Sequence, residues 1–306
     1  LADAGIASLR FDYAGHGESS GDRGWTNPFA RVSDARYVLS YLIGMQEVDP
    51  HRVGVYGHSY GGPVALHLAA ADPQVRAAVT VSGPGNGEAM LRAPRPAWEW
   101  VELKKRVAVD RLAISRGHEP EVVPVNDIFP FSPAFAAAYE KLKASQGGTR
   151  ALPGTDGLGK TSFYLASVDA MSAFRPEAAA AQLTGCPTMF INGAGDDTAP
   201  IETVGDVYRA LPGPKRWIIV PEADHNTLDT DPAHCCTSRR RQLVWCIPLD
   251  PIGVELLGQQ VPGDVRLRPE DAPWFKCVQH RVREGIGQSS GDLDVVKAVA
   301  ALGKHK

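Results

Sequence analysis

The segment Gly57-His58-Ser59-Tyr60-Gly61 matches the pattern G-x-S-x-G, in which the central serine can act as a nucleophile. An apolar run at 53–56 precedes it and an alanine-rich stretch at 62–71 follows it, so Ser59 falls between a predicted strand and a predicted helix. Glycines let the strand and the helix approach closely around this strained turn. The N–H of Tyr60, at the start of the helix, is the expected donor to a developing oxyanion.

A serine hydroxyl is a weak nucleophile at neutral pH, so the reaction needs a base and an acidic group that orients the base. Candidates follow two later apolar runs: Asp196 and Asp197 come after the run at 187–192, and His225 comes after the run at 216–220. Parallel strands place their carboxyl ends at one edge of a sheet, where we expect these side chains to meet. His225 is therefore the predicted base, and either aspartate can be the acid at this point.

Two further histidines also fall in loops near the predicted site. His58 lies inside the Ser59 turn itself, and His16 lies in the glycine-rich segment at 12–22. Neither follows the candidate acids in the chain, which is the order that this arrangement of nucleophile, acid and base requires. We therefore expect structural roles for both.

The elements that would position these residues alternate along the chain. Short apolar runs alternate with helical patterns, which predicts crossover connections and an α/β fold with a mostly parallel sheet flanked by helices. Predicted strands are 6–11, 53–56, 75–82, 187–192 and 216–220, and predicted helices are 34–42, 62–71 and 201–211.

This alternation breaks in two places. Residues 83–181 are rich in proline and contain helical runs such as 135–142. Because structureless loops of that length are rare in compact domains, a helical cap over a pocket is favoured over an irregular connection. Residues 233–306 form a C-terminal extension without clear alternation of strand and helix patterns, and a short helix is predicted at 292–302. The predicted core is thus 1–82 with 182–232.

The chain resembles the α/β-hydrolases, in the branch that includes dienelactone-hydrolase-like esterases and serine aminopeptidases. The resemblance runs from Leu1 to about residue 231 and rests on the Ser59 turn, the loop at 9–19, and the loop around Asp196 with its Gly193 and Pro200. It implies the α/β-hydrolase fold and makes Asp196 the acid, with Asp197 as second choice. In that family an earlier strand and loop supply a second oxyanion donor, so we expect this core to be incomplete at its N-terminus.

Composition limits the classes of function. The formal net charge of −3 excludes a global basic field for nucleic acid, and no run of about 18 apolar residues predicts a membrane span. Five cysteines without framework spacing suit a reducing compartment, so a cytoplasmic location is expected. No C-x-x-C pair occurs, although Cys235 and Cys236 beside His234 are a conceivable metal site. We expect no metal and no cofactor.

Residues 154–161 match the phosphate-binding pattern G-x-x-x-x-G-K-S/T and include Lys160. A nucleotide site of this kind requires a buried strand immediately before the glycine-rich loop. The preceding residues 145–150 are polar and typical of a turn, so we expect a flexible glycine loop here.

These observations predict a serine hydrolase that cleaves a carboxylic ester of a small-molecule acyl substrate through an acyl-enzyme. Ser59 at the nucleophile position differs from the aspartate of dehalogenases and epoxide hydrolases and from the cysteine of true dienelactone hydrolases. A peptidase, thioesterase or acyltransferase of the same fold is the alternative. A catalytically silent protein used for binding is a further one, motivated by the missing oxyanion strand.

Overall fold

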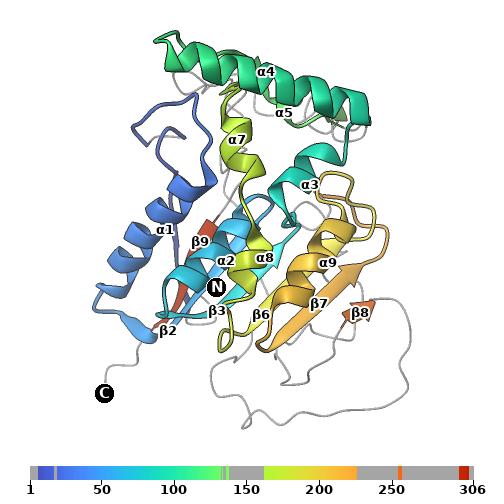
Figure 1. The fold of residues 1–306 in the computed structure, drawn as a ribbon. Coiled ribbons are helices and arrows are strands. Elements are labelled where there is room, and N and C mark those ends of the chain that lie inside the picture. Colours follow the sequence, from blue (N-terminus) through green and yellow to red (C-terminus); the bar gives the residue numbers. More distant parts are fainter. Residues whose placement is uncertain are drawn as a thin grey trace.

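A sheet of seven strands forms the centre of the molecule (Figure 1). The computed structural model describes residues 6–16, 19–131, 133, 136–137, 162–225, 254–256 and 296–302, and the seven strands lie within these ranges. The spatial order is β1-β9-β2-β3-β6-β7-β8. The strands are β1 (Ile6–Arg10), β2 (Val48–His58), β3 (Val75–Val81), β6 (Thr188–Gly193), β7 (Lys215–Val220), β8 (Val254–Leu256) and β9 (Val296–Leu302).

The strands β2, β3, β6, β7 and β8 run parallel to one another, and β9 pairs antiparallel with both β1 and β2. The predicted α/β fold with a mostly parallel sheet is confirmed. The carboxyl ends of β2, β6 and β7 therefore share one edge of the sheet, which is the edge where the candidate residues were expected.

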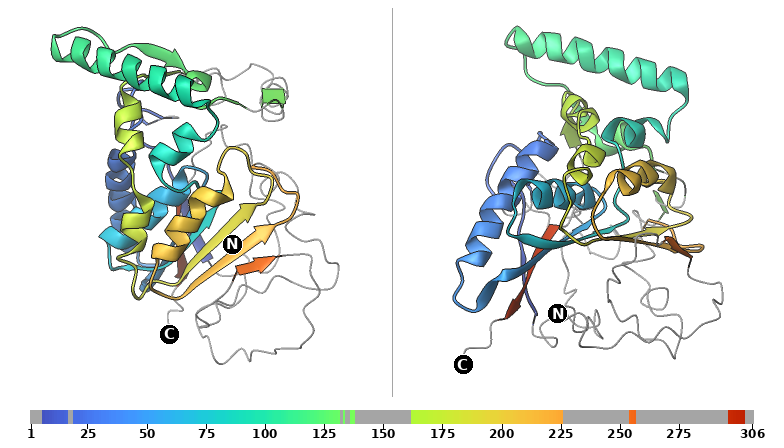
Figure 2. Two further views of the ribbon diagram at one scale, coloured as in Figure 1. Left: turned by 45° about the vertical axis from the view of Figure 1, so that its right-hand side comes forward. Right: turned by 60° about the horizontal axis from the view of Figure 1, so that its bottom comes forward.

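Four helices lie along one face of this sheet (Figures 1 and 2): α1 (Pro28–Ile43), α2 (Gly61–Ala71), α8 (Pro176–Ala180) and α9 (Ile201–Ala210). The first of them begins earlier than predicted, because the side chain of Asn27 accepts hydrogen bonds from the first-turn amides and Pro28 starts the helix. The main core lies between this layer and the sheet and includes Leu39, Leu66 and Phe190, all at most 2% exposed.

The opposite face of the sheet carries a second apolar cluster. Val81, Met189, Ile191, Ile218 and Val220 are all buried there. Strands that are apolar on both faces suit the interior of a parallel sheet, which explains the near-continuous apolar runs in the sequence.

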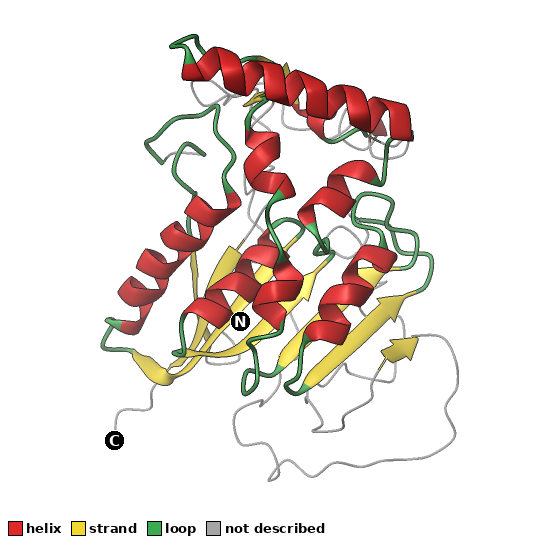
Figure 3. Cartoon of the chain, in the orientation of Figure 1, coloured by secondary structure: helices red, strands yellow, loops and turns green. Residues whose placement is uncertain are grey.

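An insertion between β3 and α8 lies above the carboxyl edge of the sheet (Figure 3). Its elements form their own apolar cluster around Trp100, Leu103 and Met171, and Tyr60 of the core joins that cluster. The division of the chain into core, cap and extension stays a prediction. The elements of the insertion are α3 (Gly87–Arg92), α4 (Ala97–Ser115), β4 (Val122–Pro124), α5 (Val125–Ile128), β5 (Ser162–Tyr164) and α7 (Ser167–Ser172).

The side chain of Asp110 on α4 fixes the arrangement of the insertion. It is 5% exposed and accepts hydrogen bonds from the backbone N–H groups of Glu121 and Ala166, at 2.9 and 3.1 Å. Glu121 precedes β4 and Ala166 follows β5, and since Val122 pairs with Tyr164 in this antiparallel sheet, both lie at the same end of it. One carboxylate therefore ties that end of the sheet to the long helix.

The prediction of a helix at 292–302 is wrong, because residues 296–302 form the strand β9. The run is short and, apart from Lys297, consists of alanine, valine and leucine. Periodicity alone does not separate a strand from a buried helix at that length. Of the predicted helix at 135–142, the structure describes residues 136–137, and the glycine loop at 154–161 lies outside the described residues. Within the described ranges, no helix combines the length and the apolar character that crossing a bilayer requires.

Candidate active site

Ser59 lies in a sharp turn between β2 and α2, in the left-handed region of backbone conformation at φ 51°. Its N–H donates to the carbonyl of Val81 at 2.9 Å, which ties the turn to the end of β3. A Cβ at Gly57 would overlap the carbonyl group of Gly61, and a Cβ at Gly62 would lie 3.0 Å from the Cα of Gly83. The close approach of backbone segments therefore requires a glycine at position 57, as the sequence predicted, and leaves little room at position 62.

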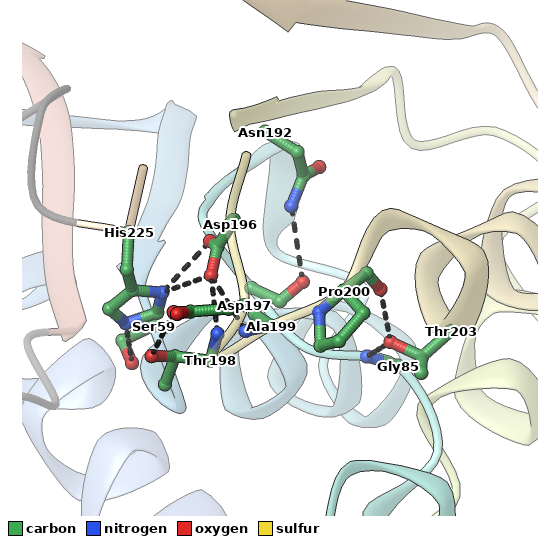
Figure 4. A network of polar contacts seen from close by, with 11 residues as sticks. Ser59, Gly85, Asn192, Asp196, Asp197, Thr198, Ala199, Pro200, Thr203 and His225 are labelled. Carbon is green, nitrogen blue, oxygen red and sulfur yellow. Dashed lines mark hydrogen bonds and ion pairs between the residues drawn. The ribbon is translucent and has the colours of Figure 1, made fainter. Parts of the chain in front are cut away.

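Three side chains that are distant in the sequence form a hydrogen-bonded chain at this turn (Figure 4). The Oγ of Ser59 lies 2.9 Å from Nε2 of His225. The Nδ1 of His225 lies 3.0 and 2.9 Å from the two carboxylate oxygens of Asp196. With the carboxylate accepting at Nδ1, that nitrogen carries the proton and Nε2 can accept from the serine hydroxyl. All three residues are buried, at 8%, 2% and 5% exposure for Ser59, His225 and Asp196.

Backbone amides fix the carboxylate of Asp196. The N–H groups of Thr198 and Ala199 donate to its Oδ1 at 3.0 and 2.7 Å. The neighbouring Asp197 is exposed, and its carboxylate accepts from the Thr198 hydroxyl instead. The structure therefore brings Asp196, and not Asp197, to His225.

Tyr60 immediately precedes α2 and has helical backbone angles, φ −60° and ψ −21°. Its N–H therefore belongs to the positive end of that helix, next to the Ser59 hydroxyl. Its side chain is 6% exposed and packs into the apolar cluster of the insertion. One residue thus combines a backbone group at the nucleophile with a ring in contact with the insertion.

The two other loop histidines take different places. The ring of His58 is buried, and its centroid lies 5.7 Å from that of His225. His16 is buried beside Arg31, whose Nη2 lies 3.0 Å from its Nε2. The ring nitrogen at hydrogen-bond distance from Oγ of Ser59 is Nε2 of His225.

Two polar side chains of the site were missed by sequence reasoning. Asn192, at the end of β6, and Thr203, in the first turn of α9, join the acid loop to the segment that opens the insertion (Figure 4). Both stand at the boundary of a predicted strand or helix next to the Asp196 loop. That position is a usable signal, although it does not reveal the partners.

Within the described residues, no group of three or more His, Cys, Asp or Glu side chains could hold a metal ion. His234, Cys235, Cys236 and Lys160 lie outside those residues. The described part of the site consists of side chains suited to proton transfer and nucleophilic attack.

Comparisons with known proteins point to one group. The family model described as "Serine aminopeptidase, S33" matches residues 1–233. An uncharacterized 31.7 kDa protein of Escherichia coli is 33% identical over 91 residues, and the chain covers only 32% of its length. Thiohydrolase aneE of Aspergillus aculeatus is 26% identical over 237 residues, which is 73% of this chain and 71% of that protein. The solved structure of DcsB in complex with its substrate analogue shares the fold, with a TM-score of 0.59 at 18% identity over 74% of this chain and 75% of that one.

Proposed function

Because the chain belongs to the serine aminopeptidase (S33) family of α/β-hydrolases, we propose that it is a serine hydrolase that cleaves a carboxylic ester through an acyl-enzyme. The family and fold that the sequence suggested are confirmed. The observation that carries the proposal is the buried chain from Ser59 through His225 to Asp196. A serine with a hydrogen-bonded imidazole, itself oriented by a carboxylate, is the arrangement that activates a hydroxyl for acyl transfer.

In the proposed reaction, Oγ of Ser59 attacks the ester carbonyl while Nε2 of His225 takes the hydroxyl proton. The N–H of Tyr60 donates to the oxyanion of the tetrahedral intermediate. The intermediate collapses, the alkoxide leaves with the proton from His225, and the acyl group stays on Ser59. A water molecule then gives its proton to His225 and attacks the acyl-enzyme, which releases the acid and returns the proton to Ser59. Asp196 keeps the imidazole in the required tautomer and stabilises its protonated form.

The test begins with covalent labelling. A fluorophosphonate probe should label the folded protein at Ser59, and mass spectrometry of the digested protein identifies the modified residue. Turnover of p-nitrophenyl esters of increasing acyl length then measures hydrolysis. A folded protein that is neither labelled nor active would favour the catalytically silent alternative.

Thioester hydrolysis is the second candidate, and one observation favours it: a relative aligned over 73% of this chain is a thiohydrolase. The same residues would act, with a thiolate as the leaving group. Matched substrates that share one acyl group, a p-nitrophenyl ester, an acyl thioester and an aminoacyl anilide, separate esterase, thioesterase and peptidase activity by kcat/KM. Transfer of the acyl group from the acyl-enzyme to an added alcohol or amine, in place of water, would indicate an acyltransferase.

A further inference from the structure

The segment that opens the insertion, Gly83–Asn86, is held by side chains of three other elements. Asn192 of β6 donates from Nδ2 to the carbonyl of Gly83 at 3.4 Å. Glu177 of α8 accepts from Nδ2 of Asn86 at 2.8 Å. Thr203 of α9 accepts from the N–H of Gly85 at 3.2 Å. Where the chain leaves the sheet to form the insertion, its path is therefore fixed by several hydrogen bonds.

Thr203 connects two segments through a single oxygen atom. While Oγ1 accepts from the N–H of Gly85, its own proton is donated to the carbonyl of Pro200 at 2.7 Å. The approach is close: a Cβ at Gly85 would overlap the carbonyl group of Thr203. One hydroxyl thus links the start of the insertion to the end of the loop that holds Asp196 (Figure 4).

The link continues to the carboxylate through a stiff piece of backbone. Ala199, immediately before Pro200, donates its N–H to Oδ1 of Asp196 at 2.7 Å. The ring of Pro200 fixes its φ, observed at −55°, which removes one of the rotations between its carbonyl and the preceding peptide. A displacement of the Pro200 carbonyl should therefore reach the amide that holds Asp196.

We propose that Thr203 is a positioning residue: its hydroxyl couples the place of the insertion to the orientation of Asp196, and through Asp196 to His225. The inference rests on the proposed function, in which Asp196 orients the base. It adds that the position of the segment Gly83–Asn86 determines the position of the acid loop. Thr203 itself contacts no reacting group.

The test uses a matched pair of variants at one position. Thr203→Val keeps the shape and removes both hydrogen bonds of the hydroxyl, while the backbone N–H of Thr203 still donates to the carbonyl of Pro200 at 3.0 Å. Thr203→Ser keeps the hydroxyl and loses only a methyl group. Thr184→Val is the control, since this exposed threonine precedes β6 at the far end of the strand from the site. We measure kcat and KM on a p-nitrophenyl ester and, independently of turnover, the low-field proton resonance of Nδ1–H of His225.

We expect Thr203→Val to lower kcat by roughly 10- to 100-fold with KM nearly unchanged, the scale of loss that a small misplacement of a catalytic group causes. The low-field resonance should shift or broaden. Thr203→Ser should restore both readouts, and Thr184→Val should match the parent. If Thr203→Val does not fold, Thr203→Ala, which adds no bulk in a helix, replaces it.

The outcomes separate this inference from the proposed function. A valine or alanine variant with parent kcat and an unchanged resonance overturns the role of Thr203, as does a serine variant as defective as the valine variant. A parent protein that neither reacts with the fluorophosphonate nor hydrolyses any ester overturns the proposed function. In that case the resonance alone decides whether Thr203 holds the Asp196–His225 contact.

Discussion

Ser59 and His225 are hydrogen-bonded at 2.9 Å between Oγ and Nε2, although 166 positions separate them in the chain. Ser59 follows β2 and His225 follows β7, and the sheet brings the two loops to one edge. The contact depends on a left-handed residue at each side, since Glu222 in the loop before His225 has φ 60° and Ser59 has φ 51°. Conformations of this kind persist where the surrounding structure fixes them, and they concentrate at functional sites.

Replacing Ser59 by alanine should abolish fluorophosphonate labelling and lower kcat at least about 10⁴-fold, because no other hydroxyl occupies the nucleophile position. The thermal unfolding midpoint should stay close to that of the parent, since only one hydrogen bond is lost. Ester turnover at more than a few per cent of the parent rate would rule out Ser59 as the nucleophile.

Replacing Asp196 by asparagine should lower kcat by about 10⁴-fold, because the amide no longer holds the imidazole with its proton on Nδ1. Asp197→Asn is the matched control, and its exposed side chain should matter little to kcat. Steady-state kinetics on one ester compares them. Equal losses in both variants, or a larger loss at Asp197, would contradict the assignment of the acid.

Gly57→Ala should destabilise the protein by more than about 3 kcal/mol, because the new Cβ would overlap backbone atoms of Gly61 that cannot move without opening the turn. Gly185→Ala serves as the comparison, since a Cβ there meets nothing within 4 Å. We expect its free energy of unfolding to change by less than about 1 kcal/mol. Urea unfolding measures both, and a Gly57→Ala variant as stable as the parent would show that the turn can relax.

Burial lowers the pKa of His67 from 6.5 to about 4. Its ring stacks on Phe174 with centroids 4.1 Å apart. Since the unfolded chain then binds a proton more readily than the native protein, this histidine lowers stability as pH falls from about 6.5 towards 4. Allowing for its partial exposure, we expect a loss of roughly 1–2 kcal/mol between pH 7 and pH 5. His67→Gln should show a correspondingly flatter dependence of the urea midpoint on pH. Identical pH profiles for the variant and the parent would show that His67 does not cause the loss of stability.

The sequence predicted most of the site because its requirements are local. A tight turn needs glycines around Ser59, and the order of nucleophile, acid and histidine follows the order of the strands. The preference for Asp196 over Asp197 came from the resemblance, and the geometry explains it: the amides of Thr198 and Ala199 hold one carboxylate while the other points to solvent.

The parts that the sequence did not predict depend on distant partners. The hydrogen bonds of Asn192 and Thr203 require the register between β3 and β6 and the exact start of α9. Neither the register nor the helix start can be predicted from a short stretch of sequence. The early start of α1 follows from the Asn27 cap, which a search for apolar spacing alone overlooks. The residues of β9 predict a helix as readily as a strand, because so short a mostly apolar run fits both periods.

The strand order has a consequence for how the candidate site assembles during folding. The loops of Ser59, Asp196 and His225 meet only after β2, β3, β6 and β7 have all joined one parallel sheet, and the pairing of β3 with β6 joins Ala78 to Thr188, 110 positions away. Non-local pairings of this kind form slowly. During refolding, helical circular dichroism should therefore recover before fluorophosphonate reactivity, and the reactivity of Ser59 becomes a kinetic marker for completion of the sheet.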